Sequence, residues 1–251
     1  MIKNKTTYLK ILSVVIAIVI WQIAAMTVGN DMLFASPIKV LVRLASVWRE
    51  KDFIPTVLFS FLRITSGYLC ALVLGIILGT AAGKVRLIEI LFKPYIAAAK
   101  AVPVASFIIL FLIWLNYNAL TVLISFLIAF PVIYTNVLQG IRSVDPKMKE
   151  LVSLYGIPWK KQIVYIYIPS VKPYLLSAAS VSVGMAWKAG VAAEVIGMID
   201  GSIGDMLYQA KIYLQNADLL CWTLIIIILS IASEKLLSLL LKAFFKGVER
   251  L

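Results

Sequence analysis

The sequence predicts an all-α integral membrane protein, with about six transmembrane helices in a single domain, residues 1–251. Hydrophobic residues make up 62% of the chain, and its mean hydropathy is +0.99. Charged residues make up only 14%, whereas soluble domains carry about a quarter. Several apolar runs also reach the roughly 18 residues that a helix needs to cross a bilayer. These observations argue against a water-soluble domain.

Six apolar runs are predicted to span the membrane. Their approximate ranges are 9–28, 57–83, 96–115, 118–139, 174–196 and 220–243. The third run is the least regular, because Pro94 and Pro103 punctuate its start. The second run contains Gly75, Gly79 and Gly83 at intervals of four residues. This spacing places small residues on one face, which suits either tight packing or a moving interface with another helix.

The distribution of lysine and arginine predicts the orientation. With a cytoplasmic N-terminus, 17 of the 24 basic residues fall in cytoplasmic segments, in keeping with the positive-inside rule. Both termini are therefore predicted to be cytoplasmic. The basic segment 1–10 resembles the start of a signal peptide, but the apolar run 11–28 is long for one, which favours a retained helix. This topology and anionic headgroups explain the net charge of +12, so we expect no nucleic-acid partner.

Residues for metal binding or catalysis are scarce. The two cysteines, Cys70 and Cys221, lie in apolar runs and are expected to be small buried hydrophobic residues, and the chain contains no histidine. This composition supports neither a disulfide framework nor a His/Cys metal site. The sequence also lacks a G-x-x-x-x-G-K-[ST] phosphate loop and any catalytic constellation. We therefore expect no metal, no catalytic residues and no cofactor bound by this chain.

The segment between the fourth and fifth spans, about 140–173, is the longest predicted cytoplasmic loop. Asp145 can cap a short helix that begins at Pro146, and Gly156 suits a left-handed residue just past its end. Four apolar residues at i, i+3, i+4 and i+7 form a stripe along this helix: Met148, Leu151, Val152 and Tyr155.

A second short helix is predicted to begin at Pro158 and to end at Pro169, because proline interrupts helical hydrogen bonding. The apolar stripe of the first helix needs a covering surface. It could pack on the protein's own helix ends or lie among lipid headgroups. Alternatively, it could dock in a groove of a soluble partner.

The spacing within the loop favours docking. Glu150, Gly156, Ile166 and Ile168-Pro169 follow the pattern E-A-A, three residues, G, nine residues, I, one residue, L-P. This pattern resembles the cytoplasmic loop signature of ABC-type importer permeases. Three positions depart from it: Leu151 and Val152 replace the two alanines, and Ile168 replaces the leucine.

The resemblance extends over residues 33–245. Five further segments, in order, are similar to permease subunits of the nitrate, sulfonate and taurine importers: "FASPIKVLVRL", "SFLRITSGYLCALVLGIILGTAAG", "KAVPVASFIILFLIWL", "AWKAGVAAEVIG" and "GSIGDMLYQAK". The resemblance implies a type I importer fold in a bacterial cytoplasmic membrane.

The resemblance also implies partners. A separate cytoplasmic ATPase would carry ATP and Mg²⁺, and an extracytoplasmic binding protein would deliver a small solute, for which an anion is one candidate. A second copy of the chain would complete the path, because one chain holds a single loop signature. Membrane lipid would surround the assembly. The ATPase would dock on Glu150, Leu151, Val152, Tyr155, Gly156, Ile166 and Pro169.

Three charged residues in or near the spans are candidates for the translocation path, because such residues usually face a helix bundle or a water-filled cavity: Arg63, Lys188 and Glu194. Lys188 and Glu194 are separated by about 240° around a helix, so they do not share a face. Lys188 could face an anionic solute, or it could snorkel or pair elsewhere. Glu194 is expected to be a structural partner rather than a solute ligand. The segment "GMIDGSIGDMLYQAK" after it suits a re-entrant or capping turn, or a plain loop.

Two other classes of function compete with this prediction. A secondary transporter would show inverted repeats and would need no ATPase, so co-purification with an ATPase separates the two classes. A membrane scaffold that transports nothing is the other alternative, and solute uptake that depends on this chain would exclude it. We see no internal repeat in the sequence.

Overall fold

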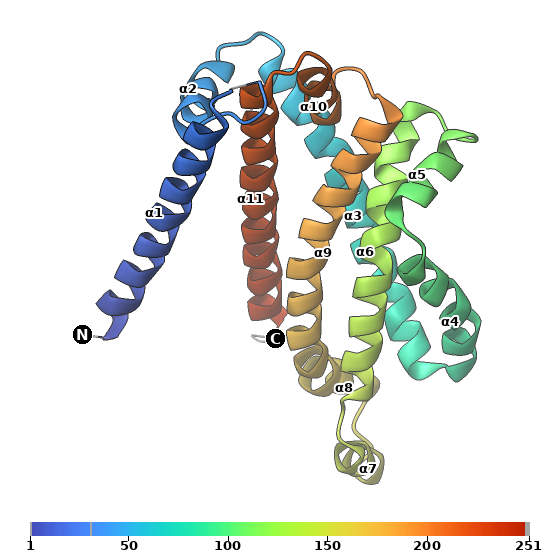
Figure 1. The fold of residues 1–251 in the computed structure, drawn as a ribbon. Coiled ribbons are helices and arrows are strands. Elements are labelled where there is room, and N and C mark those ends of the chain that lie inside the picture. The colour runs from blue at the N-terminus through green and yellow to red at the C-terminus, as the bar shows by residue number, and fades with distance from the viewer. Residues whose placement is uncertain (1, 31, 249–251) are drawn as a thin grey trace.

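The computed structural model describes residues 2–30 and 32–248, and within these residues it contains helices and no strand. The helices are α1 (Ile2–Val28), α2 (Pro37–Val47), α3 (Phe53–Lys84), α4 (Arg86–Ala101), α5 (Val104–Leu112), α6 (Tyr117–Arg142), α7 (Pro146–Leu154), α8 (Trp159–Gln162), α9 (Ile168–Gly197), α10 (Ile203–Ile212) and α11 (Asn216–Val248). A π-helical turn, Ile163–Tyr167, joins α8 to α9. The helices α2 and α10 lie at one end of the molecule, and α7 and α8 lie at the other (Figure 1).

The prediction of an all-α membrane fold is confirmed. Within the described residues, four helical segments are long and apolar enough to cross a membrane: Phe53–Lys84, Ala119–Arg142, Trp159–Gly197 and Asn216–Val248. The bent pair α4 and α5 passes the same test jointly, as a broken span or a re-entrant loop. A shorter apolar helix, Leu12–Val28, covers the first predicted span. The predicted number of six spans is therefore approximate.

The third predicted span, 96–115, is not a straight helix. Helices α4 and α5 are bent by 100° at the break between Ala101 and Val104. Pro103 explains the break, because it has no N–H to donate and it disfavours a helical conformation in the residue before it. Val102 accordingly has an extended backbone, with φ −76° and ψ 130°.

The glycines of α3 bring it close to α6. A Cβ added to Gly75 would lie 2.7 Å from Cγ2 of Ile133, and one added to Gly83 would lie 2.5 Å from Cγ2 of Ile141. At Gly79 the added atom would lie 2.9 Å from a backbone oxygen of α6. The predicted close approach of a second helix to this face is confirmed, and any larger side chain at these positions would push α6 away.

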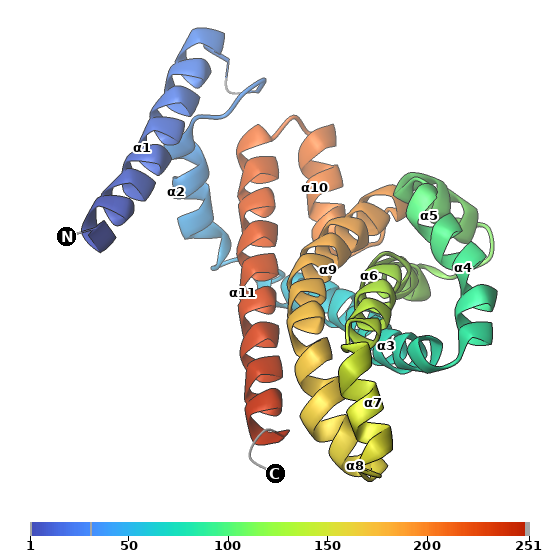
Figure 2. The same ribbon diagram turned by 90° about the horizontal axis from the view of Figure 1, so that it is seen from below.

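Helix α1 lies apart from the group formed by α3, α6 and α9, and α2 connects it to the rest (Figures 1 and 2). Ser36 caps α2 by accepting a hydrogen bond from the Lys39 N–H at 3.4 Å. The start of α1 and the end of α11 lie at the same end of the molecule as α7 (Figure 1). This arrangement agrees with the prediction that both ends of the chain lie on the same side of the membrane as the loop that holds α7. That this side is the cytoplasmic one stays a prediction.

The two cysteines differ in their surroundings. Cys221 is buried as expected, but Cys70 is exposed on α3, and both thiols are free. The expectation of burial was therefore wrong for Cys70. Sequence alone could not separate the two cases, because an apolar run in a membrane protein has one face toward other helices and another toward lipid.

Candidate functional site

Helix α7 begins as the sequence predicts. Asp145 Oδ1 accepts a hydrogen bond from the Lys147 N–H at 2.9 Å, and Pro146 occupies the first helical position. Proline fits there because the first N–H groups of a helix have no intrahelical partner. The cap and the proline therefore fix the start of a helix that lies beyond the end of α6.

Helix α7 ends at a left-handed glycine. Gly156 has φ +58°, and the Ile157 N–H donates to the Val152 carbonyl at 3.2 Å. A hydrogen bond between residues five apart across a left-handed glycine is the mark of a Schellman cap. No atom lies within 4 Å of a Cβ added to Gly156. Backbone conformation, and not crowding, therefore makes glycine the suitable residue at this position.

The apolar stripe of α7 divides into an inward and an outward part. Val152 is half-buried and lines a small cavity with Val144, Ile166 and Gln162. Other apolar side chains of α7 point outward, with exposed fractions of 46% at Leu151, 74% at Tyr155, 46% at Met148 and 78% at Leu154. The exposed side chains of the stripe do not pack on the protein's own helix ends. Of the predicted covering surfaces, lipid headgroups and a docked partner therefore remain.

Leu154 extends this exposed surface and was missed in the sequence. It lies three residues after Leu151, so a wider search for the i, i+3 pattern would have found it. Glu150 is also exposed on α7. Helix α7 thus presents one carboxylate beside an apolar patch at its end of the molecule.

The second loop helix does not end at Pro169. It passes from α8 through the π-helical turn into α9, in which Pro169 lies in the first turn. The Ile168 N–H donates to the carbonyl of Ile163, five residues earlier. This wider turn shifts the hydrogen-bond register, which lets a proline without an N–H enter the continuing helix.

The connection outside the long helices is consequently short. It covers only residues 143–158, between the end of α6 and the start of α8, whereas the sequence predicted a loop of about 140–173. Ile166 lies within the π-helical turn and Pro169 within α9. The two helices of the predicted pair thus differ. Helix α7 is a separate short helix in the connection between α6 and α8, whereas α8 is the first part of the long helical segment that continues into α9.

Glu194 is fully buried near the end of α9. Its Oε2 accepts hydrogen bonds from the Ser60 hydroxyl at 2.8 Å and from the Gly204 N–H at 3.2 Å. The Ile203 N–H in turn donates to Ser60 Oγ at 2.9 Å. Glu194 therefore connects α9 with α3 and with the start of α10, which suits a structural partner.

The other two charged candidates lie in different surroundings. The Arg63 guanidinium on α3 lies 3.6 Å from the centroid of the Phe59 ring. Lys188 is exposed on the face of α9 that also carries the exposed side chains of Val181 and Met185. The structure thus places Glu194 in the interior and Lys188 on another, exposed face of α9, as their spacing predicts.

The segment after α9 forms a capping helix, α10, at the end of the molecule opposite α7 (Figure 1). Ser202 caps it by accepting a hydrogen bond from the Asp205 N–H at 3.0 Å, and Met198 turns the chain with φ +47°. A Cβ added to Gly204 would lie 2.3 Å from the Cβ of Glu194. Of the two predicted forms, the structure therefore has a capping turn and not a plain loop.

An ion-pair network at the α10 end was not predicted. Arg43 of α2 forms salt bridges with Asp218 of α11 and with Glu50. Partial burial lowers the pKa of Arg43, but the hydrogen bonds to the two carboxylates outweigh this effect and raise the pKa overall. The network ties α2 to α11, and no local sequence pattern reveals a contact between residues 175 positions apart.

The fold and these features define a class: a helical membrane protein with a short, exposed apolar helix at one end and a capping helix at the other. Residues 71–250 match the family described as "Binding-protein-dependent transport system inner membrane component". The match covers most of the chain, so the chain belongs to this family. It is accordingly a permease subunit of an ABC importer.

Individual relatives agree with this assignment. A nitrate import permease protein, NrtB, of Synechococcus elongatus is 28% identical over 206 residues, which are 78% of this chain and 73% of the relative. A formylaminopyrimidine transport permease protein, ThiX, of Halalkalibacterium halodurans is 29% identical over 189 residues, which are 73% of each chain. The resemblance to nitrate, sulfonate and taurine importer permeases is confirmed.

A solved structure supports the fold. The crystal structure of an amino acid ABC transporter with histidines matches with a TM-score of 0.61 and 17% identity. The match covers 76% of this chain and 94% of the solved chain. At this level of identity the similarity concerns the arrangement of the helices.

Proposed function

We propose that this chain forms half of the membrane path of an ATP-driven importer in a bacterial cytoplasmic membrane and docks a separate ATPase through α7. The observation that carries the proposal is the exposure of Leu151, Leu154 and Tyr155 on a capped helix beyond the end of α6. An exposed apolar helix face is costly in water unless a partner covers it. A groove on a soluble ATPase would cover this face as in other helix-in-groove complexes.

The path from α7 to the spans supports coupling. Val152 lines a small cavity together with Ile166 and Gln162, and the segment that holds Gln162 and Ile166 continues without a break into α9. A displacement of α7 by the ATPase would therefore press on an extension of a membrane-spanning helix. In this proposal ATP and Mg²⁺ bind to the ATPase, and the permease contributes the docking helix and the span.

The proposed path lies on the exposed face of α9 and is completed by a second copy of the chain. Lys188 is exposed there in one copy, so the two copies would bring two ammonium groups toward the axis. A cationic path favours an anionic solute such as the nitrate named for one relative. An extracytoplasmic binding protein would deliver the solute at the α10 end.

Co-purification tests this proposal against a secondary transporter. The tagged permease is co-expressed with the ABC ATPase of the same transporter, extracted in mild detergent and analysed by native mass spectrometry. We expect two copies of the permease with two ATPase subunits. In the Glu150→Lys variant, reversal of the exposed charge should weaken ATPase capture if the ATPase offers a basic partner, although one exposed pair contributes at most about 1 kcal/mol.

A matched control is Lys211→Glu, which reverses an exposed charge at the α10 end and should leave ATPase capture unchanged. Solute uptake by the permease without any associated ATPase would instead support a secondary transporter. One permease copy beside a different permease chain would contradict the proposed homodimer.

A further inference from the structure

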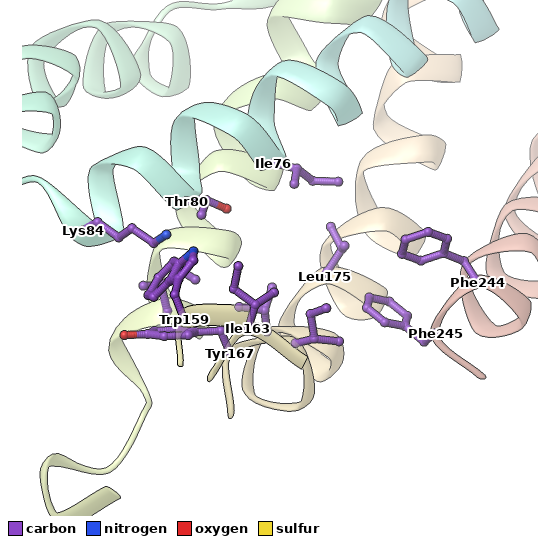
Figure 3. A pocket seen from close by; sticks show the side chains of 12 residues that line it. Ile76, Thr80, Lys84, Trp159, Ile163, Tyr167, Leu175, Phe244 and Phe245 are labelled. Atoms are coloured by element: carbon purple, nitrogen blue, oxygen red, sulfur yellow. The ribbon is translucent and has the colours of Figure 1, made fainter. Parts of the chain in front are cut away.

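An apolar groove lies at the α7 end of the molecule, between α3, the α8–α9 segment and the last turns of α11. Its volume is about 300 Å³. Figure 3 shows Ile76 of α3, Leu175 of α9 and Phe245 of α11 converging on it, with Trp159 of α8 at one edge. The Thr80 hydroxyl and the Lys84 ammonium are the polar side-chain groups that face this groove from α3.

The rim of the groove is cationic and aromatic. The Lys84 side chain is exposed, and its ammonium lies 3.7 Å from the centroid of the Trp159 ring. The Lys172 ammonium lies 5.9 Å from the centroid of the Phe245 ring. The segments that frame the groove, 80–86, 159–175 and 240–248, contain seven lysines and arginines and no acidic residue. Basic residues beside tryptophan and tyrosine are typical of the headgroup layer of a membrane.

We infer that this groove binds an anionic phospholipid of the surrounding leaflet. One acyl chain lies between Ile76, Leu175 and Phe245, and the phosphate of the headgroup faces Lys84. Basic pockets between membrane helices bind anionic headgroups because the charge attraction adds to the burial of the acyl chain. The groove supplies both parts, an apolar interior and a rim of one sign of charge.

Three other occupants of the groove are disfavoured: a second copy of the chain, a small polar solute and the ATPase. A second copy of this chain related by two-fold symmetry would bring the same basic segments against themselves. A small polar solute would find few hydrogen-bonding groups in the groove beyond Thr80 and Lys84. The exposed side chains of α7 that we assign to the ATPase do not line this groove.

The bound lipid would act on the connection between α7 and α9. Trp159, Ile163 and Tyr167, which line the groove, belong to α8 and the π-helical turn. An acyl chain packed against them holds this segment against α3 and α11. This consequence for coupling rests on the proposed function, whereas the binding of lipid does not.

Lipid titration tests the inference on the permease alone. The purified protein is delipidated and titrated with phosphatidylglycerol or with phosphatidylcholine of the same acyl chains, and bound lipid is counted by native mass spectrometry. Phosphatidylglycerol should bind more tightly. Lys84→Gln should weaken the affinity for phosphatidylglycerol about fivefold and bring it closer to the affinity for phosphatidylcholine. The magnitude follows because one lysine near an anionic headgroup contributes about 1 kcal/mol.

Filling the groove provides a second variant. Ile76→Trp should reduce the binding of both lipids, because the indole occupies the space of the acyl chain. The matched controls are Lys211→Gln, an exposed lysine at the α10 end, and Leu239→Trp, an exposed residue of α11 that does not line the groove. Both controls should bind lipid like the wild type.

Equal affinity for the two lipids, or no change in Lys84→Gln, would overturn the inference. A photo-crosslinking residue at Phe244, whose side chain is 63% exposed at the groove, identifies the occupant directly in native membranes. An adduct with phospholipid supports the inference. An adduct with a second permease or with the ATPase, in place of lipid, refutes it. Because none of these measurements requires ATPase binding, they can fail while the proposed function holds, and the reverse is also true.

Discussion

Replacing Gly156 by valine should separate docking from membrane insertion. Gly156 has φ +58°, and an L-residue in this region costs about 1–2 kcal/mol, with the β-branched valine at the upper end. If the chain relaxes to avoid the strain, it instead loses the hydrogen bond from Ile157 to Val152, at a cost of about 0.5–1.5 kcal/mol. Either route therefore disfavours the capped form of α7 by about 1–2 kcal/mol, roughly fivefold to thirtyfold in its population.

The effect should stay local, because nothing lies within 4 Å of the new Cβ and no membrane span is altered. We expect Gly156→Val to insert in the membrane normally but to lose most ATPase capture in a pull-down. In proteoliposomes, solute should no longer stimulate ATP hydrolysis. Gly156→Asn should be close to the wild type, since asparagine tolerates the left-handed conformation.

The protein contains its own geometric control. Gly201 also has a left-handed backbone, with φ +70°, and open space around its Cβ position, but it precedes α10 at the opposite end of the molecule. Gly201→Val therefore suffers a similar strain without touching α7, and it should retain normal ATPase capture. Normal capture and stimulation in Gly156→Val, or equal loss in Gly201→Val, would show that the end of α7 has no part in docking.

Two further predictions concern the charged residues of α9. Lys188→Met should reduce uptake of the anionic solute while basal ATP hydrolysis and expression stay near normal, and unchanged uptake would mean that Lys188 only snorkels or packs. Glu194→Ala should lower the thermal unfolding temperature in detergent by removing the acceptor for Ser60 and Gly204, a loss of about 2–4 kcal/mol, whereas Glu194→Gln keeps an acceptor oxygen and should be milder. Equal stability of Glu194→Ala and the wild type would refute the structural role.

Local chemistry made α7 predictable. Asp145, Pro146 and Gly156 each act through the backbone within a few residues, so the start and end of the helix could be inferred without tertiary information. The glycines of α3 were predictable for the same reason, because their spacing alone defines a face. Which helix meets that face required the structure.

The errors occurred where tertiary context decides the outcome. Pro103 breaks a span with a 100° bend, whereas Pro169 does not end its helix, because the preceding π-helical turn accommodates it. The two prolines look alike as local signals. Similarly, the hydrogen bond between Ser60 and Glu194 joins residues 134 positions apart. Helical periodicity relates only residues a few positions apart, so it could not reveal this contact.

Helix α9 carries contacts at both ends that suit it to transmit a displacement. At the α7 end it continues from α8, and a Cβ added to Gly140 of α6 would lie 2.9 Å from the Cα of Val171, so α6 and α9 cannot separate there without losing close packing. At the other end Glu194 bonds to the start of α10. Tightly packed helices shift as units rather than deform. We therefore expect force applied at α8 to move α6 and α9 together, and α10 to follow through its hydrogen bond with Glu194. If so, the Glu194 hydrogen bonds and the close approach at Gly140 should be present in both the inward-open and the outward-open state.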